Sequence, residues 1–186
     1  MTVLDTPEER QTVFPVSVEF YHEAGRLGLI GEDVELLEGV IFKKMPKSPL
    51  HQTLIRILQK MLQEIVPHSC FIDRECPITC RDSEPEPDLV VFQGDLSDYQ
   101  VRHPTTAELV IEISINTRQR DRSKAAIYAE AGVKEYWLVE PEVGTITRYT
   151  EPTSSGYKEM HTFAATQEVV SAVIPGFRVI LSDLMK

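Results

Sequence analysis

The sequence predicts an α/β fold in which a mixed β-sheet is flanked by helices, and three observations support this. Apolar runs at 107–114 and 135–140 enclose a helix-forming segment, and these lengths match a βαβ unit with two parallel strands. The stretch 48–66 has apolar residues at helical spacing and predicts an amphipathic helix that covers the sheet. After Thr145, short runs separated by Pro, Gly and Ser are typical of antiparallel strands.

Length and composition are those of a globular protein. The chain has 186 residues, enough for one domain with a full core, which we expect at 15–186 after a loose lead-in at 1–14. No apolar run reaches the roughly 18 residues of a membrane span, and the acidic N-terminus lacks the apolar core of a secretory signal. We therefore expect a cytoplasmic location. The odd set of cysteines contains no C-x-x-C pair and is interpreted as small apolar residues: Cys70, Cys76 and Cys80.

The first third of the chain predicts a helix, a hairpin and a second helix. The segment 16–27 has a partial apolar face. Two apolar runs within 33–45 flank Glu38-Gly39, which is a hairpin pattern. The helix at 48–66 begins with a Ser-Pro pair, in which Ser is the N-cap and Pro lies in the first turn.

The middle of the chain predicts strands at 70–73, 77–80 and 88–92, then a polar loop at 94–104. The strand at 107–114 is almost continuously apolar and is expected to be buried on both faces.

The helix of the βαβ unit can be capped by Asn116 or Thr117 and can end at Gly132. Within it, Lys124 and Tyr128 are four residues apart and share a face. An antiparallel meander completes the chain, with strands expected at 145–151, 157–163, 169–174 and 177–181.

Two carboxylates interrupt apolar strands and are the main candidates for chemistry. Asp88 stands where one strand begins, and Glu112 stands inside the next. Burying a carboxylate in a Val/Ile strand is costly unless something pairs with it. Two carboxylates on adjacent strands can share one cation, and their oxygens suit Mg²⁺. A lysine on the following helix, Lys124, can stabilise negative charge that develops on a scissile phosphate.

Other mechanisms lack their motifs. The sequence contains no G-x-x-x-x-G-K, G-x-G-x-x-G, G-x-S-x-G or H-E-x-x-H. The net charge of −10 weighs against binding nucleic acid through bulk charge. A local basic segment nevertheless follows the strand of Glu112. Its four cations against one acid give a net charge of +3: Arg118, Arg120, Arg122 and Lys124 against Asp121.

Six segments, taken in order, resemble a bacterial family of restriction-endonuclease-like proteins in the PD-(D/E)XK nuclease superfamily. The matching segments are 34–39, 48–51, 86–91, 109–114, 124–128 and 132–139. The resemblance implies a restriction-endonuclease-like core and a Mg²⁺- or Mn²⁺-dependent endonuclease that hydrolyses the phosphodiester bonds of DNA. Asp88 and Glu112 are the implied metal ligands, and the implied catalytic residues are Glu35, Asp88, Glu112 and Lys124.

The resemblance includes departures. Ser114 stands at the third position of E-x-K, so Lys124 on the following helix is expected to replace the strand lysine. Arg120 stands where the resemblance leads us to expect an aspartate, and this leaves the role of Asp121 open. Contacts to DNA phosphates are expected from four basic residues: Arg118, Arg120, Lys43 and Lys44. A homodimer is expected because many nucleases cut two strands with two subunits.

The residues leave other interpretations open. The fold can serve as a nucleic-acid-binding or regulatory module with weak or no catalysis, or as a structural protein with a vestigial site. Glu112 can be a buried carboxylate paired with Lys124 or Arg118 in a structural network. By pattern alone, Glu35 fits a solvent-facing strand residue. His51, in the first turn of its helix, can be a phosphate or proton contact but more often such a residue is solvated or capping.

Overall fold

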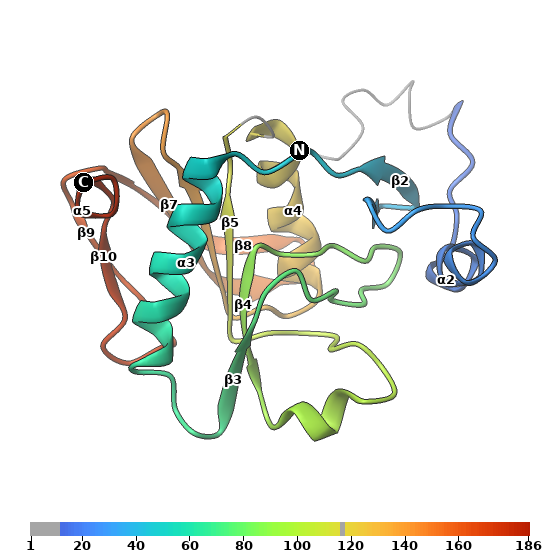
Figure 1. Cartoon of the computed structure of the whole chain (residues 1–186), viewed down its shortest axis with the longest axis horizontal. Helices are drawn as coiled ribbons and strands as arrows, with labels where there is room; N and C mark the ends of the chain where they lie inside the picture. The colour runs from blue at the N-terminus through green and yellow to red at the C-terminus, as the bar shows by residue number, and fades with distance from the viewer. Residues whose placement is uncertain (1–11, 116–117) are drawn as a thin grey trace.

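A six-stranded mixed sheet forms the centre of the protein (Figure 1). The computed structural model describes residues 12–115 and 118–186, without the side chains of residues 118 and 119. In spatial order, the strands are β3 (Cys70–Asp73), β4 (Leu89–Gln93), β5 (Leu109–Ile113), β6 (Glu135–Glu140), β7 (Thr145–Thr153) and β8 (Gly156–Ala164). β5 and β6 are parallel, and the other neighbouring pairs are antiparallel. The predicted α/β class and the parallel strands of the βαβ unit are confirmed.

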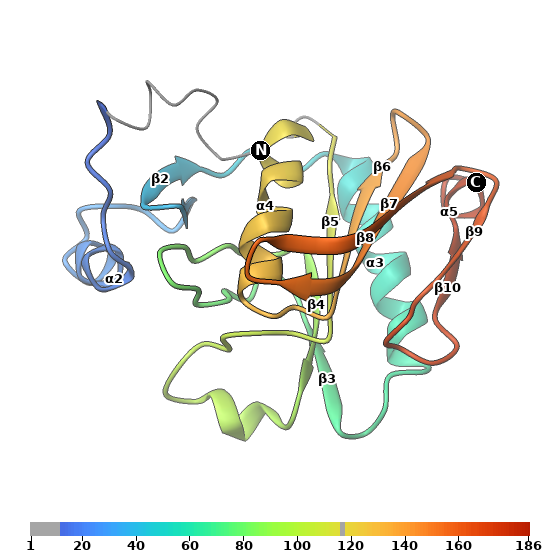
Figure 2. The same ribbon diagram turned by 180° about the vertical axis from the view of Figure 1, so that it is seen from behind.

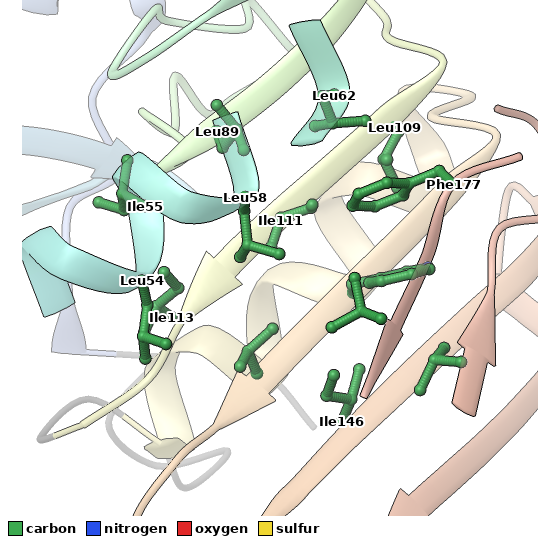
Figure 3. Packing of buried hydrophobic residues seen from close by; sticks show 14 of the residues in the cluster. Leu54, Ile55, Leu58, Leu62, Leu89, Leu109, Ile111, Ile113, Ile146 and Phe177 are labelled. Carbon is green, nitrogen blue, oxygen red and sulfur yellow. The ribbon is translucent and has the colours of Figure 1, made fainter. Parts of the chain in front are cut away.

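The two longest helices cover opposite faces of this sheet, as the two opposite views show (Figures 1 and 2). α3 (Pro49–Gln63) begins where Ser48 Oγ accepts a hydrogen bond from the His51 amide at 3.2 Å. Its apolar stripe packs on side chains of β4 and β5 (Figure 3), and the packed residues are Leu54, Ile55, Leu58, Leu62, Leu89, Leu109 and Ile111. α4 (Arg118–Glu130) covers the other face through contacts with β6, β7 and β8.

Successive side chains of a strand point to opposite faces of the sheet. Both faces of the central strands are buried because α3 covers one and α4 covers the other. Leu109 and Ile111 of β5 face α3, whereas Val110 lies in the core cluster on the α4 side. That second cluster also contains Tyr128 of α4 and Tyr136 of β6. The two layers leave Glu112 on the α4 side, one strand position beyond Ile111.

A separate β-hairpin lies at one side of the sheet, next to a short helix (Figure 1). β1 (Val34–Leu37) and β2 (Val40–Lys43) form the predicted hairpin, and α2 (Val18–Arg26) is the predicted first helix. Glu38 and Gly39 in the turn have φ of 48° and 75°, as a tight hairpin of this kind requires. A Cβ added to Gly39 would lie 2.6 Å from the Cβ of Pro15, so this turn also needs the missing side chain.

The predicted strand at 77–80 is wrong. Pro77 has no N–H group, and the amides that follow donate to carbonyls outside any ladder. Ile78 N–H donates to Pro85 O at 3.0 Å, and Thr79 N–H donates to Pro104 O at 2.8 Å. The segment joins no sheet. The polar loop at 94–104 contains a 3₁₀ helix, η1 (Leu96–Tyr99).

The last part of the meander also differs from its prediction. β9 (Glu168–Val170) and β10 (Arg178–Ile180) form a two-stranded sheet of their own, followed by α5 (Leu181–Leu184). The strand expected at 169–174 ends at Val170. The Ser171 amide still donates to Phe177 O, but the Ala172 and Val173 amides donate to the Glu135 side chain. The Glu135 carboxylate is fully buried and accepts hydrogen bonds from four donor groups. These are Trp137 Nε1 at 2.8 Å, Ser171 Oγ at 2.6 Å, Ala172 N at 3.0 Å and Val173 N at 3.2 Å.

The remaining predictions concern termini, cysteines and membrane spans. Asn116 and Thr117, the predicted caps of α4, lie outside the described residues. The three cysteines are partly buried free thiols, and burial raises the pKa of Cys76 and of Cys80 to about 12. None of the helices in the described ranges has the length and apolar character needed to cross a membrane.

Candidate functional site

The two strand carboxylates meet at one end of the sheet. β4 and β5 are antiparallel with Leu89 opposite Ile111, so one residue further Asp88 comes opposite Glu112. Ile113 N–H donates to Asp88 Oδ2 at 2.8 Å, and Asp88 N–H donates to Glu112 Oε2 at 3.4 Å. Both side chains are buried. The predicted pair of carboxylates on adjacent strands is therefore present.

α4 and the hairpin bring two more predicted residues to Glu112. Lys124 Nζ lies 3.0 Å from Glu112 Oε1 and 2.9 Å from Glu35 Oε2 of β1. Tyr128, one helical turn after Lys124, donates its hydroxyl to Glu112 Oε1 at 2.8 Å. Glu35 is buried, so the interpretation as a solvent-facing strand residue is wrong. Ser114, which stands at the third position of the E-x-K pattern, is buried directly after β5. Lys124 contacts Glu112 from the helix instead.

The position of Lys124 on α4 determines which neighbouring residues of the helix face the carboxylate cluster. Asp121, three residues earlier, is buried with Oδ1 4.0 Å from Lys124 Nζ. Arg120 points to the hairpin, where its guanidinium lies 4.8 Å from the centre of the Phe42 ring and donates to Lys43 O at 3.1 Å. Asp121 therefore takes part in the carboxylate cluster, while Arg120 lies at its border.

Burial and mutual charge shift the pKa values of this cluster. Burial alone would lower the pKa of Lys124, but Glu112, Glu35 and Asp121 raise it well above its usual value, so Lys124 is an ammonium. Burial raises the pKa of Glu112 to about 8, against the lowering effect of Lys124 and with further repulsion from Asp88, Asp121 and Glu35. One ammonium cannot balance so many carboxylates, and the site is left short of positive charge.

Asp88 has its own set of basic partners. Lys47 Nζ lies 3.0 Å from Oδ1, and His51 Nε2 lies 2.9 Å from Oδ2. Burial opposes ionisation of Asp88, but His51, Lys47 and the Ile113 amide together lower its pKa. His51 is buried and its Nδ1 has no hydrogen-bond partner in the part of the chain that the structure describes. The interpretation of His51 as a solvated residue is therefore wrong.

Lys47 is the site residue that sequence reasoning missed. It lies between β2 and the N-cap of α3, in a stretch without periodicity, and Nζ also lies 2.5 Å from Glu75 Oε1. The only sequence signal is a lysine next to the Ser-Pro pair that starts the helix. Its contact with Asp88 depends on how α3 docks on the sheet.

The four predicted catalytic residues line one cleft of about 750 Å³, together with Lys47, His51 and Asp121. Three of the four basic residues predicted to contact phosphates also line it, namely Lys43, Lys44 and Arg120. Lys44 Nζ lies 2.7 Å from Glu86 Oε2, and the largely exposed Lys43 lies 3.3 Å from Asp33. The side chain of Arg118 lies outside the described residues.

A family model described as "Putative restriction endonuclease" matches residues 27–182, which includes every element from the hairpin to β10. The chain belongs to the Uma2 family. Its fold is also that of a 1.96 Å crystal structure from Anabaena variabilis ATCC 29413, described as "a putative nuclease belonging to DUF820". The TM-score is 0.75 with 19% sequence identity over 91% of this chain and 97% of that one. No curated protein gave a significant match.

The donors of this Uma2 site fit a hard divalent cation. Mg²⁺ prefers oxygen ligands, keeps several waters and is commonly held by one or two carboxylates. Asp88 and Glu112 supply two buried carboxylates joined through backbone amides, and the Lys47 ammonium already occupies a cation position against Asp88 Oδ1. Within the described ranges, no group of three or more His, Cys, Asp and Glu side chains is arranged to hold a metal. Two carboxylates match the small number of protein ligands that Mg²⁺ commonly uses.

Proposed function

We propose that this Uma2 protein is a divalent-metal-dependent DNA endonuclease that hydrolyses phosphodiester bonds in the cleft formed by the ends of β4 and β5, the hairpin and α4. One observation carries the proposal: Asp88 and Glu112 converge from adjacent strands on a cleft that also holds the buried ammonium of Lys124. The family description and the nuclease fold support the same reaction class.

Asp88 and Glu112 are the residues that would hold Mg²⁺ or Mn²⁺. When bound, such an ion polarises a phosphoryl oxygen and lowers the pKa of a bound water. The protein orients both carboxylates beforehand. Asp88 is fixed by the Ile113 amide and His51, and Glu112 is fixed by the Tyr128 hydroxyl. In hydrolysis, water oxygen bonds to phosphorus, one ester P–O bond breaks, and the departing oxygen takes up a proton.

Lys124 is suited to stabilise charge and not to abstract a proton. Its pKa is raised because Glu112, Glu35 and Asp121 surround it, so it carries no free amine near neutral pH. An ammonium beside the scissile phosphate stabilises the negative charge of the transition state. Glu35 positions this group, since its Oε2 lies 2.9 Å from Lys124 Nζ.

DNA phosphates would contact basic side chains at the border of the cleft. Lys43 is largely exposed, and Arg120 holds the hairpin beside α4 through Phe42 and the Lys43 carbonyl. Such contacts to phosphates position a duplex without reading its sequence.

A nicking assay on supercoiled plasmid tests the proposal. With Mg²⁺ or Mn²⁺, the wild type should produce open-circular or linear DNA, and excess EDTA should stop the reaction. Asp88→Asn and Glu112→Gln keep side-chain size but remove charge, and each should slow nicking at least about a hundredfold.

Glu159→Gln is the matched control, because Glu159 is an exposed carboxylate on β8 away from the cleft. Its nicking rate should equal that of the wild type. Failure of the wild type to cut any form of DNA with either metal, or unchanged nicking by folded Asp88→Asn, contradicts the proposal.

A further inference from the structure

The Lys47 ammonium lies where a cation would contact Asp88. Its Nζ is 3.0 Å from Asp88 Oδ1, whereas Oδ2 is held by His51 and the Ile113 amide. Asp88 thus has one oxygen fixed by the scaffold and one that contacts a long, flexible side chain. Removing Lys47 from Oδ1 would leave the orientation of the carboxylate in place.

Lys47 also has a second anchor at the mouth of the cleft. Its Nζ lies 2.5 Å from Oε1 of Glu75, whose side chain is about half exposed, and the Lys47 side chain is itself 27% exposed. The lysine can therefore leave Asp88 by rotation of its own side chain and remain in the cleft. Lys124 has no such freedom, because it is only 4% exposed and is enclosed by carboxylates.

We propose that Lys47 occupies the metal-binding oxygen of Asp88 in the metal-free protein and is displaced toward a DNA phosphate when a divalent cation binds. This inference rests on the metal-dependent function proposed above. An ammonium and a divalent cation both bind to the same hard oxygen. If both contacted one carboxylate, their positive charges would lie close together and repel each other. The displaced ammonium then lies in a cleft that needs positive charge for a phosphodiester backbone.

Other cations of the cleft do not fit this role. Lys44 pairs with Glu86 at 2.7 Å, and Arg120 lies over the Phe42 ring. Neither is an ion-pair partner of Asp88, whose partners among the described residues are Lys47 and His51. Lys44 therefore offers a matched control: Lys44→Met removes the same charge from the same cleft but leaves Asp88 and its partners intact.

Calorimetric titration of Mn²⁺ without DNA tests the competition. Lys47→Met should bind Mn²⁺ roughly tenfold more tightly than the wild type, because the competing charge is gone. Lys44→Met and the charge-conserving Lys47→Arg should stay within about threefold of the wild type. Circular dichroism of each variant confirms that it is folded.

The outcomes separate this inference from the proposed function. If the wild type binds Mn²⁺ but Lys47→Met binds it equally or more weakly, the competition is refuted while the metal site stands. Equal tightening in Lys47→Met and Lys44→Met also refutes it, because a general charge effect then suffices. If the wild type binds no Mn²⁺, the metal site and the inference both fail.

DNA binding tests the displacement. Duplex affinity is measured over a range of salt concentrations, with Ca²⁺ (which takes the same oxygen ligands) and with EDTA. With Ca²⁺, the salt slope of the wild type should exceed that of Lys47→Met by about one phosphate contact. With EDTA, the two slopes should agree, because Lys47 remains on Asp88. A difference of equal size in both conditions, or in neither, overturns the displacement.

Discussion

Replacing Lys124 with methionine should strongly destabilise the metal-free protein. Methionine keeps most of the aliphatic stem but removes the ammonium that lies 2.9 Å from Glu35 and 3.0 Å from Glu112. The site already contains more carboxylates than this ammonium can balance. Without it, buried negative charges face each other or must take up protons.

The magnitude follows from the burial of Lys124, which is 4% exposed. Removing one partner of a buried ion pair costs about 3–5 kcal/mol of unfolding free energy. With a urea dependence of about 2 kcal/mol per molar, the midpoint of unfolding should fall by roughly 1.5–2.5 M. The loss should grow between pH 6 and pH 8.5, because Glu112, whose pKa is about 8, then becomes ionised.

Urea unfolding followed by circular dichroism measures this loss, in EDTA. Lys134→Met is the control, since Lys134 is 53% exposed and pairs with Glu108 on the surface, where such a pair contributes less than about 1 kcal/mol. Adding Glu112→Gln to Lys124→Met should recover at least about 1 kcal/mol, because it removes an unpaired charge. A Lys124→Met loss no larger than that of Lys134→Met would refute the electrostatic reasoning.

Three further predictions address the core, the hydroxyl and the proton at the site. Glu135→Ala should lower the free energy of unfolding in urea by about 3–5 kcal/mol, because it leaves several buried donors unpaired. The control Glu159→Ala, on the surface, should change the free energy of unfolding by less than about 0.5 kcal/mol. Equal effects of the two substitutions would contradict this prediction. Tyr128→Phe should cost about 1.5–3 kcal/mol in the same assay, as it removes a hydrogen bond to the Glu112 carboxylate, and an unchanged midpoint would count against that bond. The raised pKa of Glu112 means that the folded protein binds a proton that the unfolded chain has released. Proton and metal compete for this carboxylate, so Mn²⁺ affinity measured by calorimetry should rise with pH up to about 8 and then level off; a flat profile from pH 6 to 8 would oppose the assignment.

Local periodicity explains which parts of the site could be predicted from the sequence. Asp88 and Glu112 are recognisable because a carboxylate interrupts a strand whose other residues are apolar. The four-residue spacing of Lys124 and Tyr128 predicts a shared helix face, and both side chains contact Glu112. The family resemblance, and not its own strand pattern, implied Glu35 as a site residue.

The features that were missed depend on tertiary docking. Lys47 precedes a helix and has no periodic pattern, so nothing local places it against Asp88. His51 was recognised in the first turn of its helix, but the side of the turn that meets Asp88 is determined by the packing of α3 on the sheet.

Two errors in the fold have a similar origin. The segment 77–80 has the composition of a strand, yet its amides bond to carbonyls outside any ladder. The strand expected at 169–174 ends after Val170, and the amides of Ala172 and Val173 donate to the Glu135 carboxylate instead of to a neighbouring strand. Composition and alternation predict an extended backbone, but they do not identify its hydrogen-bond partners.

Calorimetric titration of Mn²⁺ into the wild type and into the Asp88→Asn/Glu112→Gln double variant examines the metal site without relying on a suitable DNA substrate. The geometry at the ends of β4 and β5 predicts saturable binding by the wild type and its loss in the folded double variant. Equal heats for the two proteins would contradict the metal site. The buried carboxylates would then be a structural network, and the likeness to nucleases would extend to the fold alone.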